Sequence, residues 1–311
     1  MLLSDELLKL RDTFFSMNSL ASEYSFYGYL VWQKKYDFDV LNFDNSIVIQ
    51  VKKKNAYRFP MVTANGNTNF FSDELVKKEL ISTIQKMIQV ANSEKKTLVF
   101  DRITLEQKEF LEKNFDSQFS FEIMRGDFDY LYDINSLCTL FGRKLSKKRN
   151  HVNGFLATYS DWKIEEISNK NINSLLDFSE KWYESKLKDD YEFAKDNLLY
   201  EQDAVRIFVP QIEFLRADGI ILYVNGKIAG FTVGQRLGLD AYDTVFEKAD
   251  DKIRGSYNIL NREFARYLKN KYPDLKYINR ESDIDHLGLR QSKLSYMPQI
   301  LLEKFKAQII L

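Results

Sequence analysis

The stretch GIILYVNGKIAGFTVG, residues 219–234, decides the fold, because it reads as two β-strands joined by a tight turn. Apolar and β-branched residues fill both arms, and Asn225-Gly226 between them is the strongest short signal for a two-residue hairpin. A further strand at 240–247, an amphipathic helix at 256–271 and a strand at 276–280 follow. This order predicts antiparallel β-structure that leads into a strand–helix–strand unit.

The rest of the chain shows the same order of elements on both sides of a seam near residues 133–140. The elements expected outside the hairpin region are helices at 4–20, 73–92, 105–114, 141–156, 172–187, 201–217 (divided by Pro210) and 285–291, strands at 36–41, 46–51, 97–100, 119–123 and 162–167, and a closing apolar run at 300–311. A chain of 311 residues exceeds one comfortable core. We therefore predict an α/β (α+β) protein with two domains, 1–136 and 137–311, each a mixed sheet flanked by helices.

Composition excludes several classes of protein. Lysine plus arginine equals aspartate plus glutamate at 45 each, so a global binder of DNA is not expected. One cysteine, Cys138, excludes an intramolecular disulfide and any multi-cysteine metal site. The two histidines, His151 and His286, form no ligand-spaced pair, so no metal is expected. No apolar run approaches the roughly 18–20 residues of a membrane span, and a soluble, cytoplasmic protein is expected.

A basic segment, GRKLSKKRNHVN at 142–153, is the most distinctive part of the chain. On a helical wheel Arg149 falls in the apolar stripe, so we expect an internal carboxylate partner for it, Glu281 or Asp283. The segment is either a solvated amphipathic helix or a helix that contacts phosphates. In the second reading Lys148, Arg149 and Asn153 bind substrate.

Polar residues crowd the end of the strand at 276–280, where open α/β sheets place their ligands. A general base is expected among Glu281, Asp283 and His286, and Tyr296 is a candidate acid. The alternative is that these charges neutralise one another as a structural network. The catalytic candidates are Glu281, Asp283 and Tyr296, and the further substrate-binding candidates are Glu247, Asn279, Arg280, Arg290 and Lys293.

The loop at 247–257 connects a strand to a helix. A glycine loop that opens a helix offers free N–H groups and the positive end of the helix dipole, which suit a phosphate. The cofactor-binding candidates are Lys252, Arg254, Gly255 and Ser256. The alternative to a phosphate-binding loop is an ordinary helix start with Gly255 near the cap.

Taken in order, these motifs resemble the family of the C-terminal domain of bacterial phosphatidylglycerol lysyltransferases. The matching motifs are Asp129-Tyr130-Leu131-Tyr132, Gly142-Arg143-Lys144 with 147–153, Glu247-Lys248-Ala249, Asn279-Arg280-Glu281 with Asp283, and Gly288-Leu289-Arg290 with 293–296 and Pro298, with weaker similarity around 25–32 and Tyr36. They run through most of the second half. Together they are fairly specific, whereas no single motif is.

The resemblance implies tandem GNAT-like acyltransferase domains and a soluble acyl- or aminoacyltransferase. The donor it implies is acyl-coenzyme A or aminoacyl-tRNA, and the acceptor and the oligomeric state stay open. In GNAT enzymes the pyrophosphate of coenzyme A lies on a Q/R-x-x-G-x-G/A loop, and Lys252-x-x-Gly255-x-Tyr257 departs from that pattern at its last position. Tyr257 favours the alternative of a non-catalytic ligand-binding or regulatory protein. RNA binding through 143–149 is a third reading.

Overall fold

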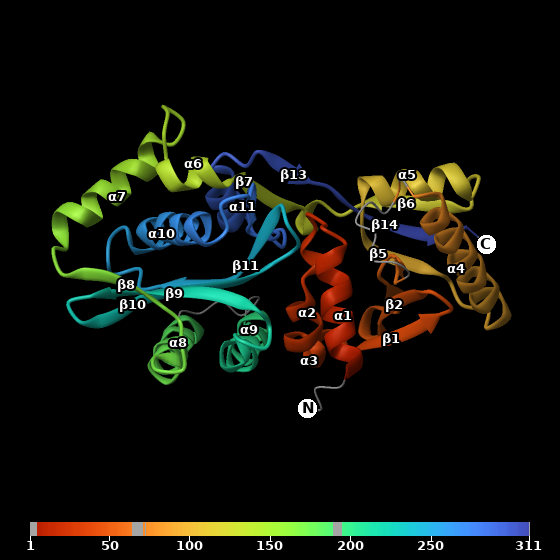
Figure 1. Ribbon diagram of the computed structural model, residues 1–311, viewed down its shortest axis with the longest axis horizontal. Helices are drawn as coiled ribbons and strands as arrows, with labels where there is room; N and C mark the ends of the chain where they lie inside the picture. Colours follow the sequence, from red (N-terminus) through yellow and green to blue (C-terminus); the bar gives the residue numbers. More distant parts are fainter. Residues whose placement is uncertain (1–4, 64–70, 72, 189–194, 311) are drawn as a thin grey trace. The chain divides into compact units, whose positions relative to one another are not determined.

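The computed structural model describes residues 5–63, 71, 73–188 and 195–310, which form two compact units (Figure 1). The first unit comprises Met1–Asp129, Ser282–His286 and Leu301–Leu311, and the second comprises Tyr130–Glu281 and Leu287–Ile300. The units therefore differ from the continuous ranges 1–136 and 137–311 expected from the sequence. Two segments from the C-terminal part of the chain belong to the first unit, and the main crossing lies after Asp129 rather than after residue 136.

The first unit is a mixed sheet with helices packed on it. Its strands, in the order β1-β2-β3-β5-β14-β6 with β4 paired to β2, are β1 (Phe38–Phe43), β2 (Ser46–Val51), β3 (Ala56–Tyr57), β4 (Met61–Val62), β5 (Val99–Thr104), β6 (Phe119–Ile123) and β14 (Lys304–Ile309). Its helices are α1 (Asp5–Ser16), α2 (Phe26–Val31), α3 (Gln33–Tyr36), α4 (Glu74–Ser93) and α5 (Leu105–Asn114), with short 3-10 turns η1 (Ser22–Tyr24), η2 (Lys52–Lys54) and η4 (Arg125–Asp127). Apolar residues of α4 and α5 pack against β5 and β14 to form its core.

The second unit is built around the predicted hairpin. Its sheet has the order β13-β7-β12-β11-β10-β9-β8, with β7 (Asp129–Asp133), β8 (Trp162–Glu166), β9 (Ala217–Val224), β10 (Lys227–Arg236), β11 (Ala241–Ala249), β12 (Tyr277–Asn279) and β13 (Ile300–Leu302). Its helices are α6 (Ile134–Thr139), α7 (Ser146–Thr158), α8 (Ile172–Lys188), α9 (Lys195–Phe208), α10 (Ser256–Lys271) and α11 (Leu287–Leu294), with the turn η5 (Val209–Gln211). Two mixed sheets flanked by helices confirm the predicted fold class.

Helices cover both faces of the second sheet. Figure 1 shows α7 and α10 on one side of β9–β11 and α8 and α9 on the other. Residues of α6, α7 and α10 share one core with β9 and β11. On the opposite face Phe178 of α8 packs on Phe231, with ring centroids 6.3 Å apart, and Phe208 of α9 packs on Phe246 at 5.7 Å. Alternate residues of β11 therefore enter two different cores.

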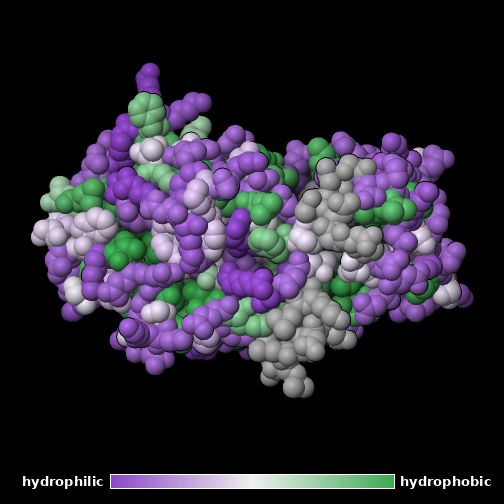
Figure 2. Space-filling view, in the orientation of Figure 1, coloured by the Kyte–Doolittle hydropathy of each residue, from purple (hydrophilic) through white to green (hydrophobic). Residues whose placement is uncertain are grey.

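Hydrophilic side chains cover most of the face seen in Figure 2, and hydrophobic ones lie among them in separate groups. This agrees with a chain in which 29% of the residues are charged and both signs are equally frequent.

Local chemistry explains where the predicted elements begin and end. Asn225 (φ 50°) and Gly226 (φ 71°) form the tight turn of the β9–β10 hairpin, as expected. Asp73 caps α4 by accepting from the N–H of Leu75 at 2.8 Å. Pro210 lies in η5, directly after α9 ends, so the helix expected at 201–217 stops there and its last part is turn rather than helix.

The helix expected at 141–156 is wrong at its start. Leu140 (φ 51°) and Gly142 (φ 91°) adopt left-handed backbone, and α7 begins only at Ser146. Leu140 is the C-terminal cap of α6, so a separate short helix precedes α7. Hydrophobic periodicity did not reveal this break.

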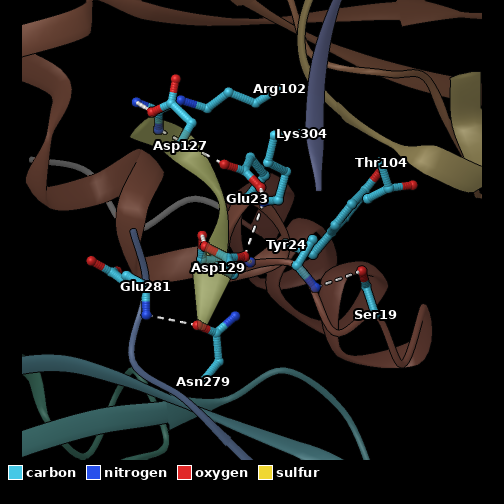
Figure 3. A network of polar contacts seen from close by, with 12 residues as sticks. Ser19, Glu23, Tyr24, Arg102, Thr104, Asp127, Asp129, Asn279, Glu281 and Lys304 are labelled. Atoms are coloured by element: carbon cyan, nitrogen blue, oxygen red, sulfur yellow. Dashed lines mark hydrogen bonds and ion pairs between the residues drawn. The ribbon is translucent and has the colours of Figure 1, made fainter. Parts of the chain in front are cut away.

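A buried ion network holds β14 in the first unit (Figure 3). The fully buried Lys304 contacts the carboxylate of Glu23 and lies 3.0 Å from that of Asp129. Asp129 also accepts from the N–H of Ser22 at 2.8 Å and from its hydroxyl at 2.9 Å. Burial lowers the pKa of Lys304, but Asp129 and Glu23 outweigh it and raise that pKa above its ordinary value. Lys304 therefore stays charged and anchors the last strand.

One glycine of the second sheet marks a site where a side chain does not fit. At the β-bulge between Val233 and Gly234, a Cβ on Gly234 would lie 2.0 Å from the carbonyl oxygen of Asp243. We expect Gly234→Ala to lower the free energy of unfolding by about 2 kcal/mol, because backbone cannot give way as a side chain can. Gly154→Ala in α7, where nothing lies within 4 Å, should instead raise it by up to about 1 kcal/mol. Urea denaturation measures both, and equal effects would contradict this reading of the bulge.

Candidate functional site

The candidate site lies where two parallel strands part. β11 and β12 pair in parallel over three residues only, from Ala241↔Tyr277 to Asp243↔Asn279. β11 then continues to Ala249, whereas the chain after Asn279 follows β7, where the N–H of Arg280 donates to the carbonyl oxygen of Tyr130 at 3.0 Å. The backbone beyond Asn279 no longer pairs with β11 there, and side chains occupy the wedge. The carboxyl end of parallel strands is where α/β sheets commonly bind ligands.

An ion pair bridges this wedge. Arg280, the first residue after β12, donates from Nη2 to the carboxylate of Glu247 on β11 at 2.8 Å. Both side chains are largely buried, at 14% and 10% exposed. Asn261 of α10 donates to the other oxygen of Glu247 at 3.3 Å. Two residues that the sequence assigned to substrate binding are thus brought together.

Several buried polar atoms around this pair have no hydrogen-bond partner among the described residues. They are Nη1 of Arg280, Oδ1 of Asn261 and Oγ1 of Thr232, which stands directly opposite Glu247 in the β10–β11 register. Unpaired buried donors and acceptors are rare, because each costs about 1–3 kcal/mol. A guanidinium donor, an amide acceptor and a hydroxyl that can donate or accept lie open beside one carboxylate, and a polar ligand would satisfy them.

Tyr296 and Lys148 complete the cluster. The buried hydroxyl of Tyr296 accepts from Nδ2 of Asn258 at 2.7 Å, so its own proton is available to a ligand. Burial raises the pKa of Tyr296 to about 12, which keeps that proton in place at neutral pH. The ammonium of Lys148 on α7 lies 4.1 Å from the Tyr296 ring centroid. Burial, with the positive charges of Arg280 and Lys147, lowers the pKa of Lys148 to about 8. Lys148 is therefore the one of these groups poised to exchange a proton near neutrality.

The neighbour of Glu247 points to the other face of the sheet. Lys248 pairs with Glu201 of α9 at 2.8 Å and lies 4.9 Å from the ring centroid of Trp182 on α8. The Glu247-Lys248-Ala249 motif therefore supplies one charge to each core, and Lys248 is not part of the wedge.

Arg149 differs from its prediction. Its Nη1 donates to the carbonyl oxygens of Leu140 at 2.5 Å and Gly142 at 3.2 Å, not to Glu281 or Asp283. The end of α6 presents carbonyls without helical partners, and the guanidinium supplies the missing donors. Arg149 thus shapes the α6–α7 connection.

The other predicted substrate residues have different surroundings. Lys293 of α11 donates to the carbonyl oxygen of Arg280 and so helps to fix the backbone that carries the Arg280 side chain. Asn279 is fully buried and accepts from the N–H of Glu281 at 2.7 Å. Asn153 lies exposed on α7, and Arg290 is partly exposed on α11.

The three predicted catalytic residues fall into both units. Glu281 and Tyr296 belong to the second unit, whereas Asp283 belongs to the first. Asp283 is fully buried, and Nη1 of Arg125 donates to it at 3.1 Å. Glu281 follows β12 with a left-handed backbone (φ 53°).

The loop at 250–255 is tightly packed. Gly255 has φ 85°, and a Cβ on it would lie 2.8 Å from the carbonyl oxygen of His151 on α7. The hydroxyl of Ser256 donates to the carbonyl oxygen of Asp250 at 2.7 Å, while Lys252 and Arg254 are exposed. Glycine at position 255 therefore allows α7 to pack closely against this loop.

Sequence reasoning missed Asn258, Asn261 and Thr232. Asn258 and Asn261 lie three residues apart on α10, and Asn261 is buried among apolar neighbours. An asparagine inside the apolar stripe of an amphipathic helix was the available signal. Thr232 gave none, because a threonine in a strand is ordinary.

The described residues hold neither a cluster of metal ligands nor a membrane-spanning helix. No three His, Cys, Asp or Glu side chains gather as metal ligands in residues 5–63, 71, 73–188 and 195–310. Within the same ranges, no helix is both long and apolar enough to cross a membrane.

Comparison with known proteins shows which fold and which family this chain shares. A curated relative, an uncharacterized protein of Mycoplasmoides gallisepticum, is 26% identical over 68% of this chain and 65% of its own length, so the match spans less than two thirds of that relative. A solved structure of a conserved protein of unknown function from Bacteroides thetaiotaomicron is 31% identical, covers 98% of this chain and 97% of its own, and has a TM-score of 0.84.

Two more distant structures share the fold. L-PGS from Bacillus licheniformis (TM-score 0.62, 15% identical, 98% of this chain and 91% of that one) and FemX (0.61, 9% identical, 100% and 97%) are similar throughout. The predicted tandem GNAT-like fold is thereby confirmed. The family model described as phosphatidylglycerol lysyltransferase, C-terminal, matches residues 14–308. The chain therefore belongs to the phosphatidylglycerol lysyltransferase C-terminal family.

Proposed function

We propose that this protein is an acyl- or aminoacyltransferase whose reaction takes place in the wedge between β11 and β12, in the cytoplasm. The observation that carries the proposal is the set of buried, unpartnered polar atoms beside the Glu247–Arg280 pair. In this reaction an amine or hydroxyl of the acceptor attacks the carbonyl carbon of an activated ester or thioester. The new bond forms as the ester or thioester bond breaks, and the leaving alcohol or thiol takes a proton.

Each residue of the wedge has a role in this proposal. The Tyr296 hydroxyl donates to the carbonyl oxygen as negative charge develops on it, and the open Nη1 of Arg280 binds a second oxygen of the donor. Lys148, as the neutral amine, takes the proton of the attacking group, with Glu281 as the competing base. Asn261 and Glu247 hold the polar end of the acyl group.

The donor is acyl-coenzyme A or aminoacyl-tRNA. The helix backbone of α7 fills the space beside Gly255, which leaves less room for a pyrophosphate on that loop and favours tRNA. Residues 134–160 contain no Asp or Glu, and exposed Arg143, Lys144 and Lys147 there suit a phosphate backbone. The same packed loop also favours the alternative, a non-catalytic ligand-binding protein, for which saturable binding without turnover is expected.

The first experiment is a thermal-shift screen with coenzyme A, acyl-coenzyme A, tRNA and aminoacyl-tRNA, followed by a turnover assay with the ligand that binds. A ligand at a hundred times its Kd stabilises by about 2.7 kcal/mol. With the donor identified, Tyr296→Phe should lower kcat about 100-fold with the fold intact, and Tyr277→Phe on β12 should leave it unchanged. Full activity in Tyr296→Phe would contradict the assignment.

The pH profile separates the two candidate bases. If Lys148 is the base, the rate rises about tenfold per pH unit and levels off above pH 8, since the pKa of Lys148 is lowered to about 8. Lys148→Met should remove that rise, whereas Glu281→Gln should keep it. The reverse result would assign the base to Glu281.

A further inference from the structure

Cationic side chains from four segments of the first unit lie around Tyr36, the last residue of α3. The ammonium of Lys35 lies 5.2 Å and that of Lys54, in η2, 5.7 Å from the Tyr36 ring centroid. Arg58, after β3, and Arg102, on β5, both lie close enough to Tyr36 to lower its pKa. These segments are up to 67 residues apart in the chain, so the grouping is a product of the fold.

A β-bulge contributes to this grouping. Phe100 pairs with Ala307 and Ile103 with Phe305, so that Asp101 and Arg102 together stand opposite the single residue between them on β14. Arg102 takes left-handed backbone there, with φ 58°. Bulges of this kind redirect side chains, and here the carboxylate of Asp101 lies 3.2 Å from Lys54 and 3.3 Å from Arg58.

Some hydrogen-bond donors of these arginines have no acceptor among the carboxylates of the first unit. Arg58 is 7% exposed and donates from Nη1 to Asp101, yet its buried Nε–H has no acceptor. Arg102 pairs with Asp127 at 2.7 Å, as Figure 3 shows, and its buried Nε–H likewise has no acceptor. No described residue hydrogen-bonds the hydroxyl of Tyr36. The two buried Nε–H groups call for a missing partner, and the partly buried Tyr36 hydroxyl beside them is a third possible donor to an anion.

The electrostatic field at Tyr36 has the matching sign. Burial raises the pKa of Tyr36, but Arg102, Lys35, Lys54 and Arg58 outweigh it, and that pKa lies below its ordinary value. The cations therefore stabilise a negative charge at this place even with Asp101 and Asp127 present.

We propose that the first unit binds a phosphate-bearing anion, held by the hydroxyl of Tyr36, the ammonium of Lys54 and the guanidinium groups of Arg58 and Arg102. Phosphate is the ligand that this donor set suits, because its several oxygens accept from guanidinium and hydroxyl groups at once. The site is separate from the wedge of the second unit and does not depend on the proposed transfer reaction. The phosphate belongs either to a small molecule or to a phosphodiester backbone.

The test is calorimetric titration of the full chain with inorganic pyrophosphate and, separately, with a single-stranded oligonucleotide. Tyr36→Phe keeps the ring and should weaken binding about tenfold, and Lys54→Met should weaken it by a similar factor. The matched controls are Tyr57→Phe on β3 and Lys52→Met, a lysine of the same turn paired with Asp39, and both should bind as the wild type does. Tighter binding of the oligonucleotide with a steep salt dependence assigns a phosphodiester source, and tighter binding of pyrophosphate assigns a small molecule.

A spectroscopic reading distinguishes direct contact from a general loss of positive charge. The difference in tyrosinate absorbance between wild type and Tyr36→Phe reports Tyr36 alone, and bound pyrophosphate should shift that titration to higher pH. The proposal is overturned if neither probe binds at about 1 mM, if both variants bind as the wild type does, or if the titration of Tyr36 does not move.

Discussion

Lys304→Met should lower the free energy of unfolding by about 3–5 kcal/mol, because it removes the buried cation that the carboxylates of Glu23 and Asp129 share, although Arg102 still lies 3.8 Å from Glu23. Glu23 and Asp129 both contact the Lys304 ammonium, and each of these side chains is at most 6% exposed. Methionine replaces the volume of lysine, so the loss reflects charge rather than a cavity. Urea denaturation at pH 7 measures it.

The control for this variant lies two residues along the same strand. Lys306→Met removes an exposed cation, 3.6 Å from an exposed Glu122, and should cost less than about 1 kcal/mol. The deficit of Lys304→Met should also shrink as the pH falls, since protonation neutralises the carboxylates of Glu23 and Asp129. A deficit that equals the control at every pH would show that the network contributes nothing to stability.

Arg280→Met should have an effect of similar size on stability and a further one on function. It leaves Glu247, 10% exposed, with only the amide of Asn261, which costs about 3–5 kcal/mol. The double variant Glu247→Leu with Arg280→Met should recover most of that stability, because a buried ion pair is often replaceable by apolar residues. Chemical denaturation of the singles and the double measures the coupling.

Functional assays distinguish a substrate-binding role of the Glu247–Arg280 pair from a purely structural one. If the pair binds substrate, the stable double variant has no transferase activity and no thermal shift with the donor. Lys248→Met is the matched control, because it breaks a partly buried pair with Glu201 on the opposite face of the same strand. It should lose stability and keep donor binding. A double variant that binds the donor normally would make the Glu247–Arg280 pair purely structural.

Much of the fold could be predicted from local signals in the sequence. Asn225-Gly226 located the hairpin, Pro210 the end of α9, and strand-end polarity pointed to Glu247 and Arg280, which the structure joins. These inferences rest on residues near each other in sequence or on the known polarity of one sheet edge. They could be made from the chain alone.

Long-range pairing could not be inferred in the same way. The apolar run at 300–311 gave no sign that β14 inserts between β5 and β6, because a short strand does not encode its partners. The partner of Arg149 depended on two left-handed residues that end α6 early. The cations around Tyr36 come from segments far apart in the chain, and the bulge in β5 that places Arg102 has no signature in the sequence.

The position of β14 bears on how the protein is made. A ribosome releases the residues of β5 and β6 long before those of β14, with the whole second unit between them. During translation the first unit therefore exists with the place between β5 and β6 vacant, and the facing edges of these strands exposed. The second unit can form its sheet from β7 to β12 earlier, with only the edge strand β13 still to come. The part of the chain that is synthesised first is thus the part whose folding ends last.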